Sequence, residues 1–168
     1  MWPFGHDHVV QRLAAIPPGT TGAVAARVTV VSESSVVSPL SGLASAFLQI
    51  DLLERLIDEY VVLGSVKYGQ VLRLRDCDGD EVSVVAAAVR FEPSTLLGGQ
   101  PVTDILPELA PYLRNATGRG ILCSREHALR TGDAVLLKAV VEPSRTRYLV
   151  RDDLAPVVLA EVVDVPVW

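Results

Sequence analysis

The sequence predicts a mainly β protein built as a small barrel, with one or two short helices. Of its 168 residues, 27 are valine, and most fall in short clusters bounded by Gly, Pro, Asp or Ser, which is typical of several short strands. Hydrophobic residues make up 49% and charged residues 21%, so the chain has enough apolar material to fold around a core. This length favours a single domain.

Seven stretches of the chain are predicted to be strands, and two further valine-rich stretches in the tail, 148–150 and 156–167, are expected to close the sheet or to dock on it. The seven are residues 23–31, 44–51, 61–63, 70–75, 81–90, 121–124 and 134–142. The first follows the proline- and glycine-rich segment 17–22 and alternates valine with other residues, which favours a strand with one buried face. The pattern leaves open whether the second strand runs on toward Ile57 or whether 52–56 forms a helical turn.

The clearest local signal is a hairpin between residues 70 and 90. Two stretches rich in valine and leucine flank the segment 76–80, which contains an Asp-Gly pair. Glycine takes positive φ angles at little steric cost, so this pair favours a tight turn between antiparallel strands. We therefore expect a hairpin tip at 76–80.

Residues 103–114 are the best helix candidate. Thr103 can cap the first turn, but prolines at 107 and 111 would limit or kink the helix. No linker or internal repeat divides the chain, so we expect an N-terminal segment, 1–21, followed by a single β-rich domain, 22–168. Many short strands with small helices are typical of an OB-like or related barrel, whose closure removes exposed strand edges.

Composition argues against several classes of function. The net charge of −5 and the pI near 5.1 have the wrong sign for a protein that neutralises nucleic-acid phosphates. The longest apolar stretch, 36–50, is interrupted by Ser, Pro and Gly and does not make a transmembrane segment. The first residues lack a signal-peptide pattern, and Cys77 and Cys123 lie far apart. We therefore expect a reducing, cytoplasmic compartment.

Three motifs resemble those of a known domain family. They are Ser38, Pro39, Leu40, Ser41 and Gly42 before a strand, Asp76 and Gly79 between two strands, and Glu126, Gly132 and Asp133 before a valine-rich strand. Their order is similar to that of the GIDE domain, also called the beside-a-membrane domain, over residues 22–142. The resemblance implies a non-catalytic module that recognises a protein partner or supports assembly, with the motif residues in structural turns.

The chain departs from the family's best-known members, which are mitochondrial and chloroplast ubiquitin ligases. It has neither their two transmembrane helices nor the cysteine and histidine spacing of a RING finger, so their ligase activity does not follow. The family also occurs in prokaryotic proteins, and this chain is similar to that type. Peripheral contact with a membrane, through an anchor on a separate chain, remains an alternative to a purely cytoplasmic location.

Metal and catalytic sites are the weaker interpretations. The stretch His6-Asp7-His8 offers metal ligands, but only His127 could add another imidazole. The three aspartates of 76–80 alternate as in a calcium loop, yet the glycine and glutamate positions of that loop are wrong. Cys123 lies four residues before His127, but we expect a buried structural thiol. We therefore predict no metal, no cofactor and no catalytic residue.

Aromatic residues near the chain ends are candidate partner anchors. Aromatic side chains make up only 5% of the residues, yet Trp2, Phe4 and Trp168 lie at the two ends. They could anchor a partner, a second subunit or a membrane interface, or dock on the domain's own core. The favoured function is a protein-binding adaptor or an assembly module that acts as an oligomer. The alternatives are an OB-like barrel that binds a small ligand or nucleic acid, and a metal-dependent enzyme.

Overall fold

The structure is a computed structural model that describes residues 9–10, 12–93, 99–145 and 147–162. Strands dominate this part of the chain, which confirms the mainly β class, and its helical elements are short 3-10 helices. The strands are β1 (Val9–Val10), β2 (Gly22–Val30), β3 (Val36–Val37), β4 (Ala44–Ser45), β5 (Phe47–Arg55), β6 (Tyr60–Tyr68), β7 (Val71–Arg75), β8 (Glu81–Val85), β9 (Val89–Glu92), β10 (Gln100–Pro101), β11 (Ile121–Leu129), β12 (Ala134–Pro143), β13 (Tyr148–Val150) and β14 (Val157–Glu161). The 3-10 helices are η2 (Leu13–Ala15), η3 (Ala86–Ala88) and η4 (Ala110–Asn115).

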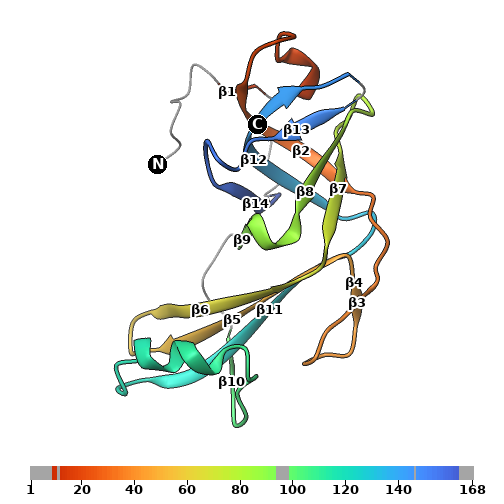
Figure 1. Ribbon diagram of the computed structural model, residues 1–168. Coiled ribbons are helices and arrows are strands. Elements are labelled where there is room, and N and C mark those ends of the chain that lie inside the picture. The colour runs from red at the N-terminus through yellow and green to blue at the C-terminus, as the bar shows by residue number, and fades with distance from the viewer. Residues whose placement is uncertain (1–8, 11, 94–98, 146, 163–168) are drawn as a thin grey trace, which may run out of the picture.

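Five of the strands close into a barrel (Figure 1). Around the barrel the order is β2, β7, β8, β13, β12 and back to β2. The neighbouring pairs are antiparallel except β8 with β13, which is parallel. Numbered along the chain, the five strands are therefore arranged first, second, third, fifth and fourth, as in the Greek-key barrels of the OB-like kind. This arrangement confirms the predicted small barrel.

The third and fifth barrel strands are each interrupted and then continue. The short helix η3 separates β8 from β9, and a turn at 151–154 separates β13 from β14. Beyond these interruptions β9 and β14 pair in parallel again. Arg151 holds the second interruption in place, because its guanidinium donates to the carboxylates of Glu142 and Asp153. The barrel wall therefore extends past its five-stranded ring toward the second sheet.

The alternation of buried and exposed residues along the strands produces the barrel core. In β7, Leu72 and Leu74 are fully buried between exposed neighbours, because successive side chains of a strand point to opposite faces. Leu13 and Ile16, which precede the barrel, are buried in the same cluster. Each fully buried side chain of this size contributes about 1.5–3 kcal/mol relative to an exposed one. Part of the predicted N-terminal segment therefore belongs to the barrel core.

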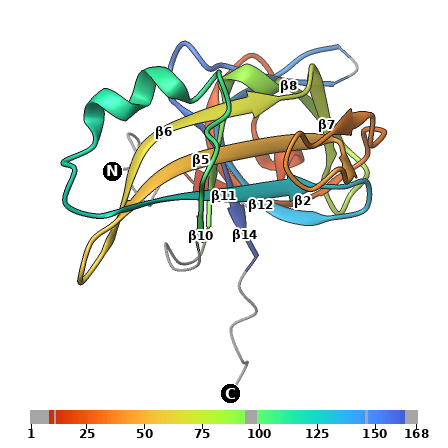
Figure 2. The same cartoon turned by 90° about the horizontal axis from the view of Figure 1, so that it is seen from below.

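A second sheet is built from two long insertions in the barrel. One insertion, between β2 and β7, supplies β5 and β6, and the other, between β9 and β12, supplies β10 and β11. The strand order in this sheet is β10, β11, β5, β6. Figures 1 and 2 show it beyond one end of the barrel, with the segment 102–116 crossing its outer face. The inner face therefore points toward the barrel.

The structure resolves one alternative that the sequence left open, and it shows that one prediction was wrong. Residues 52–55 continue β5 rather than forming a helical turn, because both faces of this strand are covered and its side chains are buried in succession. The helix expected at 103–114 is reduced to the short η4, which Thr103 does not cap. Pro107 and Pro111 lack N–H donors, and a proline ring clashes with the preceding helical turn. In the described part of the chain, no helix is long and apolar enough to cross a membrane.

Candidate functional site

The first motif segment forms the turn of the hairpin between β3 and β4. The side-chain oxygen of the buried Ser38 accepts hydrogen bonds from the N–H groups of Leu40 and Ser41, both at 3.1 Å. Gly42 donates to the Ser38 carbonyl at 3.0 Å and has a φ of +74°, which strongly favours glycine. Pro39 lies where its fixed φ suits a turn. These residues therefore shape the hairpin.

Asp76 has a similar role in the hairpin between β7 and β8, whose predicted tip is confirmed. Its Oδ1 accepts from the N–H groups of Asp78 (3.0 Å) and Asp80 (2.9 Å), and its Oδ2 accepts from Leu13 (3.2 Å). The three aspartates have carboxylate oxygens within 4.8 Å of one another. Burial, with the charges of Asp76 and Asp78, raises the pKa of Asp80. Because Asp76 already binds backbone N–H groups, the cluster works as a turn.

The third motif segment forms the turn between β11 and β12. Asp133 accepts a hydrogen bond from the Arg130 N–H at 2.7 Å, and Gly132 has a φ of +93°. The Ser41 hydroxyl donates to the carboxylate of Glu126 at 3.1 Å, which brings the first and third motifs into contact. The motif residues therefore lie in turns or support them.

A buried cluster of polar side chains lies where the second sheet meets the barrel. We call it the polar joint, and its members are Gln49, Asp51, Ser65, Arg125 and His127. Four of them are at most 9% exposed, and Ser65 is half-buried. The strand register places Gln49 beside His127, and Asp51 beside Arg125 and Ser65. These side chains share the inner face of the sheet because paired residues point to the same side.

Asp51 is the centre of the polar joint. Its Oδ1 accepts from Gln49 Nε2 at 2.9 Å and from Ser65 Oγ at 2.6 Å. Its Oδ2 lies 3.0 Å from both Arg125 Nη2 and His127 Nε2. Burial alone would raise the pKa of Asp51, but the hydrogen bonds from His127, Ser65, Arg125 and Gln49 outweigh burial and lower it to about 2. The buried carboxylate is therefore charged at neutral pH and is compensated by Arg125.

The polar joint connects the second sheet to the barrel strand β9. Gln49 Oε1 accepts from the Phe91 N–H at 2.9 Å, while Gln49 Nε2 lies 3.3 Å from the Phe91 carbonyl. The rings of Phe91 and His127 lie 4.9 Å apart. Gln49 thus pairs with β9 much as a neighbouring strand would. Because both oxygens of Asp51 are engaged, the geometry of the joint is that of a structural link.

Sequence reasoning missed the polar joint. The predicted strand 121–124 stops before Arg125, because a run of polar residues resembles a surface loop. The signal that could have revealed the joint is the spacing of two between Gln49 and Asp51, repeated between Arg125 and His127. Polar residues at that spacing lie on one face of a strand.

The other candidate residues lie apart from one another. Cys123 is buried, as expected, and four residues along β11 separate it from His127 by about 13 Å. Arg125 is buried, and Arg151 is paired with the carboxylates of Glu142 and Asp153. The candidate anchors and the histidine stretch lie outside the described residues: Trp2, Phe4, His6, Asp7, His8 and Trp168.

The outward side of β7 and β8 is an open surface that carries apolar residues. We call it the outer face, and it consists of Val71, Arg73, Arg75, Glu81, Ser83 and Val85, with Leu149 of β13 beside Ser83. Val71, Val85 and Leu149 are 54%, 57% and 37% exposed. Three aliphatic side chains therefore face solvent on one side of the barrel.

Two open hollows flank Arg73 on the outer face. One, of about 620 Å³, lies between the segment 32–36 and the turn from β6 to β7. The other, of about 430 Å³, is lined by Arg147 and the hairpin between β7 and β8. The carboxylate of Glu81 pairs with Arg73 at 3.0 Å and with Arg75 at 2.6 Å, which neutralises part of their charge. The face is therefore concave at both ends and of mixed charge.

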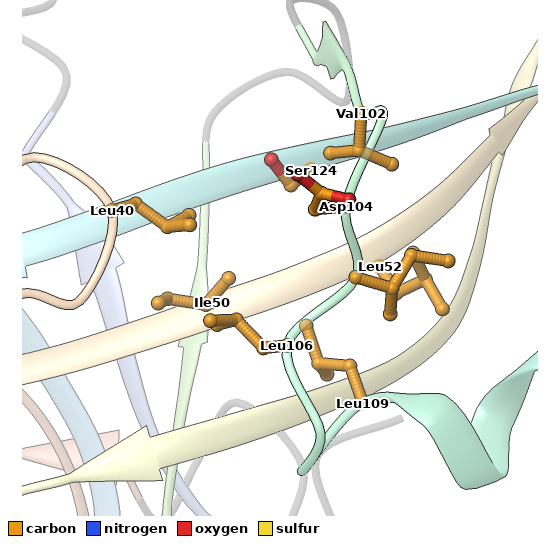
Figure 3. Close-up of a pocket in the computed structure, with 9 residues that line it drawn as sticks. Leu40, Ile50, Leu52, Val102, Asp104, Leu106, Leu109 and Ser124 are labelled. Carbon is orange, nitrogen blue, oxygen red and sulfur yellow. The ribbon is translucent and has the colours of Figure 1, made fainter.

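A third cavity, over the second sheet, is too small for a ligand. Figure 3 shows Leu40 of the hairpin reaching toward Ile50, with Leu106 beside it and Asp104 near Ser124. The space measures about 10 Å³, which is close to the minimum for one water molecule. It is a packing gap between the hairpin and the segment 102–116.

Comparisons with known proteins identified no relative. No protein-family model, no curated protein and no solved structure matches this chain. The interpretation of its function therefore rests on its own residues and geometry.

Proposed function

We propose that this chain is a non-catalytic, GIDE-like module that binds a partner protein through its outer face. The observation that carries the proposal is the composition of that face, where three exposed aliphatic side chains lie beside paired arginines and two hollows. Apolar side chains gathered among polar ones are typical of protein interaction sites. The contact between Ser41 and Glu126 supports the family resemblance, because it joins two of its motifs.

A second candidate function uses the same face. The OB-like strand order favours binding of a small ligand or nucleic acid there, and Arg147 has no ion-pair partner within the described residues. However, the outward positions of β7 and β8 include no aromatic ring on which a base could stack. Arg73 and Arg75 are also already paired with Glu81. These features favour a protein partner.

The experiment that tests the proposal compares three forms of the full-length chain. Cytosol from the native host is passed over three immobilised proteins: the wild type, the Val85→Glu variant and an Ile57→Glu control. The captured proteins are then quantified by mass spectrometry. Ile57 is fully exposed and lies between β5 and β6, so its substitution leaves the outer face unchanged. We expect a partner that wild type and control retain and that Val85→Glu loses at least tenfold.

The two candidate functions give different results in a second assay. Fluorescent single-stranded and duplex DNA are titrated with wild type and with Arg147→Ala at two salt concentrations. Salt-dependent binding that Arg147→Ala weakens would establish the second candidate. If every captured protein binds all three forms equally, the outer face is not the interface.

A further inference from the structure

The backbone ladder between β2 and β7 ends early and leaves a notch in the barrel wall. The two strands share only two paired positions. Beyond these, the Val31 N–H donates to the Arg73 carbonyl at 2.9 Å, but the Arg73 N–H donates to the side chain of Ser32 at 2.6 Å. A side chain thus takes the place of a backbone acceptor. From Ser32 onward the chain leaves the edge of β7.

The start of β7 consequently has an open backbone edge. Gln70 accepts from the Ala86 N–H at 2.8 Å on the side of β8. Because backbone groups of successive residues point to opposite edges of a strand, the N–H and C=O of Val71 point away from β8, toward the notch. The Val71 carbonyl accepts a long hydrogen bond, 3.4 Å, from the Ser32 hydroxyl, and within the described residues the Val71 N–H has no partner.

This edge opens into the larger hollow beside the outer face. The hollow measures about 620 Å³, which lies within the range of roughly 300–1,000 Å³ for ligand sites. Val36 and Val71 provide apolar walls, and the exposed Glu33 lies on the same rim. Glu33 forms no ion pair within the described part of the chain. The hollow therefore offers backbone groups, an apolar wall and an uncompensated negative charge.

We propose that an extended segment of the partner protein adds to β7 as a strand in this notch. The segment takes the place that β2 leaves, runs antiparallel to β7, and exchanges backbone hydrogen bonds with Val71. An aliphatic side chain lies against Val36, and a lysine or arginine lies near Glu33. This inference rests on the proposed function, and it specifies how the partner is recognised.

The test uses peptides selected for binding. A displayed library of linear nine-residue peptides is selected on the full-length wild type, and the best sequence is synthesised with single N-methyl groups at each amide. We expect binding to fall about tenfold or more at the one amide that donates to the Val71 carbonyl and to stay within twofold at its two neighbours, because the next outward-pointing residue of β7, Arg73, already bonds Val31 and Ser32. A Glu33→Gln variant should favour peptides with fewer cationic residues.

Val71→Pro tests the same contact from the side of the protein. Proline is tolerated at the first residue of a strand, and the N–H that it removes is not used in the fold, so we expect a folded variant that binds the peptide at least tenfold more weakly. Val71→Thr keeps the N–H and a β-branched side chain, and should bind within a fewfold of wild type. Slower exchange of the Val71 amide on peptide addition gives an independent readout if Val71→Pro does not fold.

The outcomes separate this inference from the function on which it rests. Peptides whose binding no single N-methyl group weakens, and that leave the exchange of the Val71 amide unchanged, overturn strand addition but not protein binding. Failure to select any peptide, together with no capture in the cytosol experiment, overturns both. A second copy of the chain as the occupant would appear as a dimer in light scattering that Val71→Pro dissociates, and this would also overturn the partner-segment proposal.

Discussion

Replacing Asp51 by asparagine tests the energetic role of the polar joint. The variant keeps the size of the side chain but removes the negative charge that faces the buried Arg125. Breaking one partner of a buried ion pair costs about 3–5 kcal/mol, because the other charge is left uncompensated. We expect urea unfolding at pH 7 to show a loss of about that size. Glu92→Gln, which breaks the exposed pair with Arg90, should cost less than about 1 kcal/mol.

The pH dependence of this difference gives a second, sharper test. The pKa of Asp51 is about 2 in the folded protein and 3.8 as an ordinary value. Because the folded-state pKa is the lower one, the carboxylate stabilises the fold above about pH 4 and loses that contribution as the pH falls through 2. A shift of this size corresponds to roughly 2 kcal/mol. The stability difference between wild type and Asp51→Asn should therefore shrink by roughly 2 kcal/mol between about pH 5 and pH 2.

Two results would refute this account of the polar joint. One is a cost below about 1 kcal/mol for Asp51→Asn at pH 7, and the other is a difference that stays constant down to pH 2. A double variant adds an internal check. Asp51→Leu combined with Arg125→Met removes both buried charges, so it should be more stable than Asp51→Leu alone.

Three further predictions concern single contacts, each measured by urea unfolding. Gly64→Ala should destabilise the chain by about 1–3 kcal/mol, because the added Cβ would lie 2.1 Å from the Tyr112 ring, and Tyr112→Ala in the same chain should recover part of that loss. Ser38→Ala should cost about 1–3 kcal/mol, since two N–H groups of the hairpin turn lose their acceptor; a neutral result would mean that solvent replaces it. Leu74→Ala, at a fully buried position, should cost about 2–5 kcal/mol. A smaller loss of stability would indicate that neighbouring side chains move into the cavity left by the leucine.

The barrel could be predicted from the sequence to the extent that its signals are local. The hairpin between β7 and β8 combines alternating residues with an Asp-Gly turn, and both signals lie within about twenty residues of chain. The helix predicted at 103–114 is confined to the short η4, because Pro107 and Pro111 limit it even more strongly than expected from the sequence.

The polar joint could not be predicted in the same way. Whether Arg125 is a surface residue or a buried one depends on Asp51, which lies 74 residues away along the chain. Sequence alone did not indicate that the two insertions form one sheet. It therefore could not show that Asp51 and Arg125 are buried as a pair. The notch at Val71 depends likewise on where β2 leaves β7, which is set by the Ser32 side chain rather than by hydrophobic periodicity.

The second sheet also has a consequence for how fast the barrel can close. Thr29 of β2 and Ala134 of β12 are paired although they lie 105 residues apart in the chain. If β5 and β11 pair first, from Phe47 with Leu129 onward, the remaining loop shortens to about 23 residues, which lowers the entropy cost of closure by about 1.3 kcal/mol. The refolding rate, measured by stopped-flow fluorescence, should fall about tenfold when the pairing of β5 with β11 is weakened. An unchanged refolding rate would show that the barrel closes without early pairing of β5 with β11. A slower rate would show that the second sheet forms first and brings the distant strands β2 and β12 together during folding.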